Sequence, residues 1–525
     1  MSDYRKLFLL IFIVGVAVRL FTAVALPDSA LSDTLYHLTI AKGAVETGFF
    51  QTGAAGIFEI SALPPPLFHT FVAVGSILLG QPIQFVHAVH FTLLVSLVQL
   101  LLAFVLLRKL FPEHWVYGMV FFTILPLITK FGGVNYVETL VTIFVMFAFW
   151  LYVKFRETGQ NKFMWVSIFP LAAMSVTKLN AALLLPIFVL LFAFTAKKKN
   201  LQTKPIAIFV ILALVLSGGW FVLDFLNTGE LFSSNPGVIE HVASYPAWGL
   251  SSASSLSPLV FWIDLNANFW AFPPEPAFQS GFAQNIFPFI NALPYETYFL
   301  LFSLLTIPLS LFLVVSLLKQ AKNKEPYAIA LLFLFSIAMI AVLLRSRFFP
   351  KARMLFPVVP LLAITFAQGL RNLTGNKKKI LVALTVLIAV YSFLNIALLS
   401  VYYGNSFQQS TALYDAIGET PVDSMIIVAG NHVRAVRYFS ERNALGPEEA
   451  FVISKQDDPI PIVMALSQEE IYSRLKELEI THFAVTCVDN PWDIDAVREM
   501  HNKGALEELF REECAALYKV NGGLT

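Results

Sequence analysis

Residues 84–107 have the sequence QFVHAVHFTLLVSLVQLLLAFVLL and are followed at once by Arg108 and Lys109. The stretch contains no Asp, Glu, Lys or Arg, and about 20 apolar residues are enough for a helix to cross a bilayer. We therefore predict a transmembrane helix that ends at a basic pair. The whole chain shows the same tendency, since 57% of its 525 residues are hydrophobic and only 14% are charged. A soluble domain has about 25% charged residues.

Similar apolar runs recur along the chain, and we predict about eleven transmembrane spans. The runs are 7–26, 84–107, 116–129, 137–153, 163–177, 180–196, 205–226, 298–318, 327–344, 354–370 and 380–402. Two of them, 116–129 and 163–177, are short, but each is bounded by charge and removing one would invert every later loop. The run 67–79 has the length of a re-entrant or interfacial piece.

Lysine and arginine in the short loops predict the orientation, because cytoplasmic loops carry an excess of these residues. Basic clusters that fall on one face in this threading lie at 5–6, 108–109, 154–162, 197–204, 319–324 and 371–379. That face, which includes the N-terminus, is predicted to be cytoplasmic. The extracytoplasmic face then holds the long loops 27–66 and 227–297 and the C-terminal part of the chain.

The chain changes character near residue 404, where charged residues become frequent and apolar runs become short. Short β-type runs alternate there with helical patterns, which favours a small α/β layer domain. The β-type runs are 424–428, 451–454 and 482–488, and the helical patterns are 433–441, 467–478 and 494–502. We predict a helical membrane domain over 1–403 and an extracytoplasmic α/β domain over 404–525. Cys487 and Cys514 both lie in the second domain, where they either pair or stay free.

The first external loop places Asp33 and His37 shortly after the first span. The run 36–48 is compatible with an interfacial helix that lies on the membrane, for which Asp33 is a favoured N-cap. Alternatively, Asp33 is a carboxylate held at the membrane surface as a base or metal ligand, and the two roles are compatible. His37 lies one turn further on the same face and is either a substrate ligand or a satisfied interfacial residue.

Two further ionisable residues are predicted at the external ends of spans. Glu138 opens the span 137–153, where it is either stabilised by the helix dipole or a functional acid. Lys178 separates two apolar runs, against the excess of positive charge expected on the cytoplasmic side. It either snorkels to the interface or provides a point charge for a phosphate.

The short external loop between the ninth and tenth runs holds four cations: Arg345, Arg347, Lys351 and Arg353. Their position on the external side departs from the excess of Lys and Arg expected in cytoplasmic loops, which suggests a specific role. They hold either anionic lipid headgroups or a lipid phosphate that the planar guanidinium groups contact in bidentate fashion. The long loop 227–297 is rich in Trp and Pro, and we predict that it covers a site.

Several classes of function lack their sequence signals. The chain has no Walker A motif, no convincing G-x-G-x-x-G motif and no Cys/His zinc spacing. Its net charge of +1 gives no global basic surface for nucleic acid.

Taken in order, the polar motifs resemble those of the GT-C superfamily of integral membrane glycosyltransferases. The likeness is to dolichyl-phosphate-mannose protein mannosyltransferases and lipid A aminoarabinose transferases. Segment 31–37 (LSDTLYH) resembles the acidic first-loop motif, and 136–140 (YVETL) sits where such enzymes carry a second acidic residue. Segment 177–180 (TKLN) is similar to their Thr-Lys motif. Segment 353–360 (RMLFPVVP) is similar to their Arg-Tyr-x-x-Pro-x-x-Pro stretch, with Met354 where Tyr is usual.

Two departures from the pattern matter. The family often has adjacent acidic residues in the first loop, whereas Thr34 follows Asp33 here. The Trp-Trp-Asp-Tyr-Gly motif of oligosaccharyltransferases is absent, which argues against transfer of a whole oligosaccharide to Asn.

The resemblance implies a glycosyltransferase that moves a sugar from a polyprenyl-phosphate donor to a protein, lipid or glycan acceptor outside the cytoplasm. Asp33 would be the base and Glu138 would orient the acceptor. The substrate-binding residues would be His37, Lys178, Arg345, Arg347 and Arg353. Metal dependence stays open, and a divalent Mg²⁺ or Mn²⁺ ion would have Asp33 and Glu138 as ligands. The alternatives are a lipid-phosphate transporter or flippase, and a non-catalytic relative that binds glycolipid.

Overall fold

The computed structural model describes most of the helical segments and the C-terminal sheet. The described residues are 2–25, 31–47, 66–80, 85–125, 128, 137–178, 181, 184–199, 203–228, 266, 270, 295–325, 327–329, 331–332, 334, 357–429, 436, 439–445, 473, 475–485, 499–512 and 515–521. The chain divides into two compact units, Met1–Leu26 with Ser61–Ser400, and Pro27–Ile60 with Val401–Thr525. The segment 27–60, predicted to be part of the first external loop, therefore belongs to the same unit as the C-terminal sheet.

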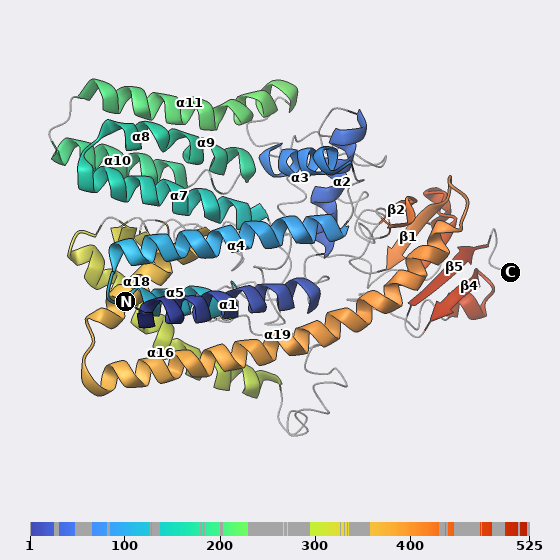
Figure 1. Ribbon diagram of the computed structural model, residues 1–525. Helices are drawn as coiled ribbons and strands as arrows, with labels where there is room; N and C mark the ends of the chain where they lie inside the picture. Colours follow the sequence, from blue (N-terminus) through green and yellow to red (C-terminus); the bar gives the residue numbers. More distant parts are fainter. Residues whose placement is uncertain are drawn as a thin grey trace. The chain divides into compact units, whose positions relative to one another are not determined.

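The first unit is helical (Figure 1). Its helices are α1 (Ser2–Ala25), α3 (Pro66–Leu79), α4 (Phe85–Leu110), α5 (Trp115–Ile124), α7 (Val137–Thr158), α8 (Asn161–Val166), α9 (Ile168–Thr177), α10 (Leu185–Lys198), α11 (Thr203–Thr228), α16 (Tyr295–Lys322), α18 (Val359–Arg371) and most of α19 (Gly375–Gly418). Among the described residues, four helical stretches are long and apolar enough to cross a membrane: Lys6–Ala23, Phe91–Leu110, Val137–Thr158 and Leu300–Lys322. The chain is thus an integral membrane protein, as predicted, while the number and orientation of its spans stay predictions.

Helix α7 is the central helix of this unit. Protein buries 72% of its membrane-spanning window, compared with 28% for the window in α1. Helices α4, α9 and α10 pack against it, and Figure 1 shows α4 and α10 beside it. Edge-to-face and tilted aromatic rings contribute to this packing: the ring centroid of Phe192 in α10 lies 5.4 Å from that of Tyr152 and 5.6 Å from that of Phe155. Such ring pairs contribute about 0.5–1.5 kcal/mol beyond the area that they bury, which gives a structural role to some of the chain's 50 phenylalanines.

The short apolar runs become short helices. The run 116–129 is helical only to Ile124, since Leu125 has an extended ψ of 126°. The run 163–177 is divided between α8 and α9, which are separated only by Ser167. The run 67–79, predicted to be re-entrant or interfacial, is the helix α3.

Helices α16 and α18 approach closely where α18 has Gly369. A Cβ atom at this position would lie 2.7 Å from Phe312 Cζ and 3.0 Å from Ser316 Cβ. Real Cβ atoms do not come this close to their neighbours, so the two helices need a residue without a side chain here.

We predict that Gly369→Leu separates α16 from α18 and destabilises the protein by about 1–3 kcal/mol, the usual cost of overpacking. The measurement is the temperature at which half of the purified protein is no longer monodisperse after heating. The matched control is Gly219→Leu in α11, because no atom lies within 4 Å of a Cβ at Gly219. Equal midpoints for the two variants would contradict the close approach.

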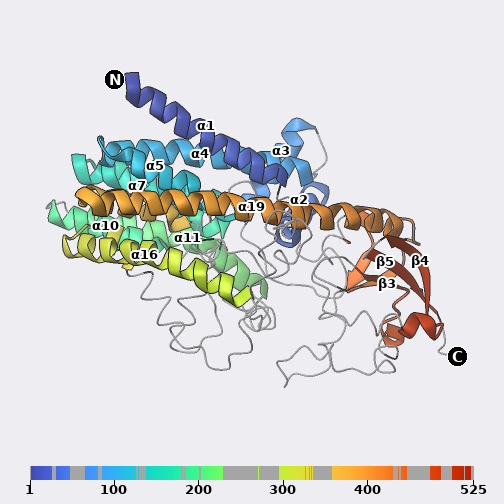
Figure 2. The ribbon, with the colours of Figure 1, turned by 90° about the horizontal axis from the view of Figure 1, so that it is seen from below.

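The second unit contains α2 (Leu31–Thr47), the end of α19 and a five-stranded sheet (Figures 1 and 2). The strands are β1 (Met425–Ala429), β2 (Asn443–Leu445), β3 (His482–Val485), β4 (Leu506–Glu512) and β5 (Ala515–Val520), in the order β2-β1-β3-β5-β4. β2, β1 and β3 are parallel, while β5 and β4 join as antiparallel strands. The predicted α/β domain is confirmed.

The composition of each strand explains whether it was predicted from the sequence. β1 is apolar throughout and β3 is fully buried, as is typical of parallel strands covered on both faces. β4 has the sequence LEELFRE with mostly exposed residues, and its charges protect an edge strand from pairing with another chain. Those same charges hid it from sequence analysis, which missed the β4–β5 hairpin. The strand predicted at 451–454 lies outside the described residues.

His482 at the start of β3 is paired across the strands with Lys519 of β5. Burial of the imidazole, and then the positive charge of Lys519, lower the pKa of His482 below its usual value. His482 therefore binds a proton less readily in the folded protein than in the unfolded chain.

We predict that His482 makes the second unit less stable in acid. A histidine with a lowered folded pKa contributes stability above its unfolded pKa of about 6.5, and this stability is lost as pH falls below that value. Thermal unfolding of wild type and His482→Gln between pH 7.5 and about pH 5 is the measurement. The wild type should lose more of its midpoint over this interval than the variant, and parallel profiles would contradict the assignment.

Candidate functional site

Glu138 and Lys178, both predicted site residues, form an ion pair in the first unit. Glu138 lies in the first turn of α7. Lys178 is the C-cap of α9, where an extended backbone (φ −152°, ψ 131°) ends the helix. The Lys178 ammonium donates a hydrogen bond to Glu138 Oε1, with the side chains 25% and 3% exposed. A buried carboxylate without a cation would cost several kcal/mol, so the pair explains how Glu138 is accommodated.

Helices α4, α7 and α9 also carry buried polar side chains. The buried side chain of Gln99 donates a hydrogen bond from Nε2 to the carbonyl of Thr139, the residue after Glu138. Three buried polar atoms on these helices have no hydrogen-bond partner among the described residues: Gln99 Oε1, Thr139 Oγ1 and Ser175 Oγ. Such atoms cost free energy unless something binds them, so this end of α7 is suited to a polar ligand.

Sequence analysis missed Arg19, which is completely buried in α1. Its Nε donates to Ser96 Oγ at 2.7 Å, its Nη1 donates to the carbonyl of Gly15 at 3.0 Å, and its guanidinium lies 5.8 Å from the Phe122 ring centroid. Nη2 has no hydrogen-bond partner in the described part of the chain. The signal was present in the sequence, since an arginine inside an apolar run is costly and marks a polar interior.

Between the end of α11 and the start of α16 the structure describes two residues, Asn266 and Trp270, and both form hydrogen bonds to α16. Asn266 donates to Thr306 Oγ1 at 2.8 Å and accepts from Ser310 Oγ at 2.6 Å, while Trp270 Nε1 donates to the same Ser310 Oγ at 2.9 Å. Trp270 is 2% exposed. The loop therefore reaches α16 at two successive turns, and the prediction that it covers a site stays a prediction.

Asp33 and His37 lie on α2 in the second unit. The helix begins at Leu31, so Asp33 is in its first turn and the N-cap interpretation is wrong. The side chain of Asp33 falls outside the described part of the chain, and that of His37 is half-buried. The apolar face predicted to rest on the membrane is buried by protein at Leu38 and Ala41.

An ion pair connects α2 to the remainder of its unit. Lys42 Nζ lies 3.0 Å from Glu441 Oε1, and this hydrogen bond, followed by the lysine charge, lowers the pKa of Glu441. Both side chains are largely exposed, so the pair adds little stability. The remaining predicted residues, Arg345, Arg347 and Arg353, lie outside the described residues, as do Cys487 and Cys514.

Comparisons with known proteins define the fold. The archaeal oligosaccharyltransferase AglB from Archaeoglobus fulgidus, solved with an inhibitory peptide and a dolichol-phosphate, matches with a TM-score of 0.55 and 12% identity, over 92% of this chain and 70% of AglB. ArnT from Cupriavidus metallidurans, bound to undecaprenyl phosphate, matches with a TM-score of 0.52 and 13% identity, over 98% of each chain. The fold is that of the GT-C glycosyltransferases.

Sequence comparison adds little to this result. No protein-family model matches the chain. An uncharacterized protein from Aquifex aeolicus is 24% identical over 370 residues, which are 66% of this chain and 70% of that protein. The GT-C assignment therefore rests on tertiary structure, and it confirms the predicted resemblance at the level of the fold.

The residues that the structure describes include no cluster of candidate metal ligands. Glu138 has its charge balanced by Lys178, and no group of three or more His, Cys, Asp or Glu residues in the described segments lies close enough to hold a metal ion. The metal role suggested for Asp33 and Glu138 stays a prediction.

We predict that the effects of Glu138→Gln and Lys178→Met on stability are not additive. Each single substitution should destabilise the protein, and adding the second substitution should cost much less than it does on its own. Each single substitution leaves the partner charge buried, so the coupling free energy in the cycle should be about 0.5–3 kcal/mol. Thermal unfolding of the four proteins in lipid nanodiscs measures it. A matched cycle on the exposed pair Lys109–Glu157, at 3.1 Å, should give a coupling near zero.

Proposed function

We propose that this GT-C protein transfers a sugar from a polyprenyl-phosphate donor to a hydroxyl-bearing protein, lipid or glycan acceptor on the extracytoplasmic face. The observation that carries the proposal is the buried Glu138–Lys178 pair at one end of the central helix of a GT-C bundle. The carboxylate can orient the acceptor hydroxyl, and the ammonium can stabilise the leaving phosphate. Two proteins with this fold were solved with a polyprenyl phosphate bound, which supports a lipid-linked donor.

The transfer requires a base and a stabilised leaving group. The acceptor hydroxyl gives its proton to the Asp33 carboxylate, and its oxygen forms a bond to the anomeric carbon of the donor. The bond between that carbon and the phosphate oxygen breaks, and its electron pair leaves with the polyprenyl phosphate. Negative charge thus accumulates on the phosphate, where fixed cations lower the barrier. Lys178 and the arginines 345, 347 and 353 are the proposed cations.

The ion pair adds one step to this scheme. Lys178 is neutralised by Glu138, so it binds a phosphate only by exchanging the carboxylate for the phosphate oxygens. The exchange leaves the Glu138 carboxylate available to accept a hydrogen bond from the acceptor hydroxyl. Binding of the donor phosphate to Lys178 would then be coupled to release of the Glu138 carboxylate from Lys178. Until the donor binds, the buried carboxylate stays paired with the lysine.

We expect the two partners of the pair to affect the donor in opposite directions. Lys178→Met should weaken polyprenyl-phosphate binding about tenfold or more, the value of one charge-assisted hydrogen bond. Glu138→Gln should bind the lipid phosphate at least as tightly as wild type, because Lys178 no longer has a competing carboxylate, and should transfer sugar more slowly. Binding of undecaprenyl phosphate in nanodiscs and single-turnover transfer from radiolabelled polyprenyl-phosphate sugars measure the two quantities, with Lys109→Met as the control lysine.

The same assay tests the catalytic assignment. Asp33→Asn should abolish transfer with donor binding retained, and Arg353→Ala should weaken donor binding. Normal turnover by Asp33→Asn would remove the base assignment, and unchanged donor affinity in Arg353→Ala would remove that residue from the phosphate site. Saturable donor binding that depends on Arg345 and Arg353, without turnover of any donor, would instead indicate a flippase or a glycolipid-binding protein. Running each donor with and without EDTA tests metal dependence.

A further inference from the structure

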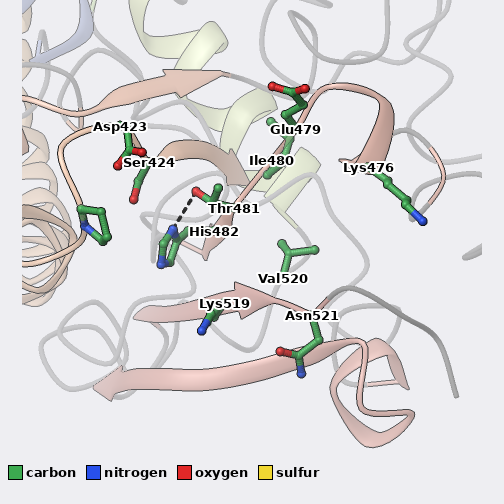
Figure 3. Close-up of a pocket in the computed structure, with 11 residues that line it drawn as sticks. Asp423, Ser424, Lys476, Glu479, Ile480, Thr481, His482, Lys519, Val520 and Asn521 are labelled. Carbon is green, nitrogen blue, oxygen red and sulfur yellow. Dashed lines mark hydrogen bonds between the residues drawn. The ribbon is translucent and has the colours of Figure 1, made fainter.

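The second unit contains a cavity of about 510 Å³ that has no part in the proposed transfer step. It lies where the loop before β1, the start of β3 and the end of β5 meet (Figure 3). Its volume is within the range of about 300–1,000 Å³ that is common for small-molecule sites. The site would therefore hold a molecule of one or two rings.

The charges that line this cavity cancel. Lys476 and Lys519 are opposed by Asp423 and Glu479. His482, the other titratable residue of the lining, has a pKa lowered by burial and by Lys519, so it adds no charge at neutral pH. An anionic ligand would be repelled by the two carboxylates and a cationic ligand by the two lysines. The lining therefore favours a neutral molecule.

Hydrogen-bonding groups lie on two sides of the cavity. Figure 3 shows Asp423, Ser424, Glu479 and Lys476 toward one side, with Lys519 and Asn521 toward the other side and His482 between them. The amide nitrogen of Asn521 donates to the carbonyl of Gly504 at 3.0 Å. A ligand in this cavity thus meets hydrogen-bond donors and acceptors on both sides.

Backbone contacts fix the floor between the two sides. The Thr481 hydroxyl accepts from the Met425 N–H and donates to the Met425 carbonyl, both at 3.0 Å, and lies 2.9 Å from His482 Nδ1. The imidazole therefore has one nitrogen held within the protein. Beside these polar groups, Pro421, Ile480 and Val520 give the lining an apolar part.

We propose that this cavity binds a neutral, polyhydroxylated carbohydrate of one or two sugar units. A sugar hydroxyl both donates and accepts hydrogen bonds, so it fits a lining that combines carboxylates, amines and an amide. The C–H faces of a sugar ring are apolar and would pack on Pro421, Ile480 and Val520. The bound sugar belongs to the glycan acceptor or product; this last assignment rests on the proposed function.

The test is saturation-transfer NMR on the full chain in lipid nanodiscs, which avoids glycoside detergents. The probes are maltose and glucose, with glucosamine and glucose 6-phosphate as cationic and anionic analogues. We expect saturable binding of the neutral sugars, and at least about tenfold weaker binding in Asp423→Asn/Glu479→Gln. The control is Glu512→Gln, which removes an exposed carboxylate of β4 that does not line the cavity and should bind as wild type does.

Three results would overturn the proposal: no saturable binding of either neutral sugar, stronger binding of a charged analogue, or equal affinity in the cavity variant and the control. Asp33→Asn separates this site from the transfer site. Sugar binding that persists in this variant while no donor supports turnover by wild type would remove the proposed function and leave the carbohydrate site in place.

Discussion

A carboxylate buried in a membrane-embedded helix bundle needs a cation beside it, and the Glu138–Lys178 pair meets this requirement. Glu138 is almost fully buried, so water screens its charge weakly, and the ammonium of Lys178 compensates it. The pair joins two helix ends, since Lys178 is the C-cap of α9 and Glu138 lies in the first turn of α7. The candidate chemistry therefore lies where these two helix ends meet.

The packing around α7 makes this contact possible. Aromatic rings from α7, α10 and α11 interlock, with Phe192 lying 5.4 Å from both Tyr152 and Phe209. Close packing leaves few conformations open to the ends of these helices. Polar side chains such as Gln99 and Arg19 cross between the helices in the same unit. Such bonds are strong where water is absent, but each unsatisfied atom is costly.

The second unit follows a different physical rule. Its sheet buries apolar strands on both faces and exposes charge at its edge strand β4. It also includes α2, the helix that carries Asp33, and the ion pair Lys42–Glu441 joins that helix to its unit. The residue proposed as base and the residues proposed to hold the phosphate thus belong to different units.

The sequence alone determined that this chain is a membrane protein with an α/β domain at its C-terminus, because spans and buried strands are local apolar patterns. It also identified Glu138 and Lys178 as unusual, since an ionisable residue beside an apolar run is visible at short range. Only the tertiary structure decided that these two residues meet, that Arg19 is buried against Ser96, and that the charged stretch 506–512 is a strand. Each of these depends on contacts between segments far apart in the chain, and no local pattern encodes which distant partner will compensate a charge or extend a sheet.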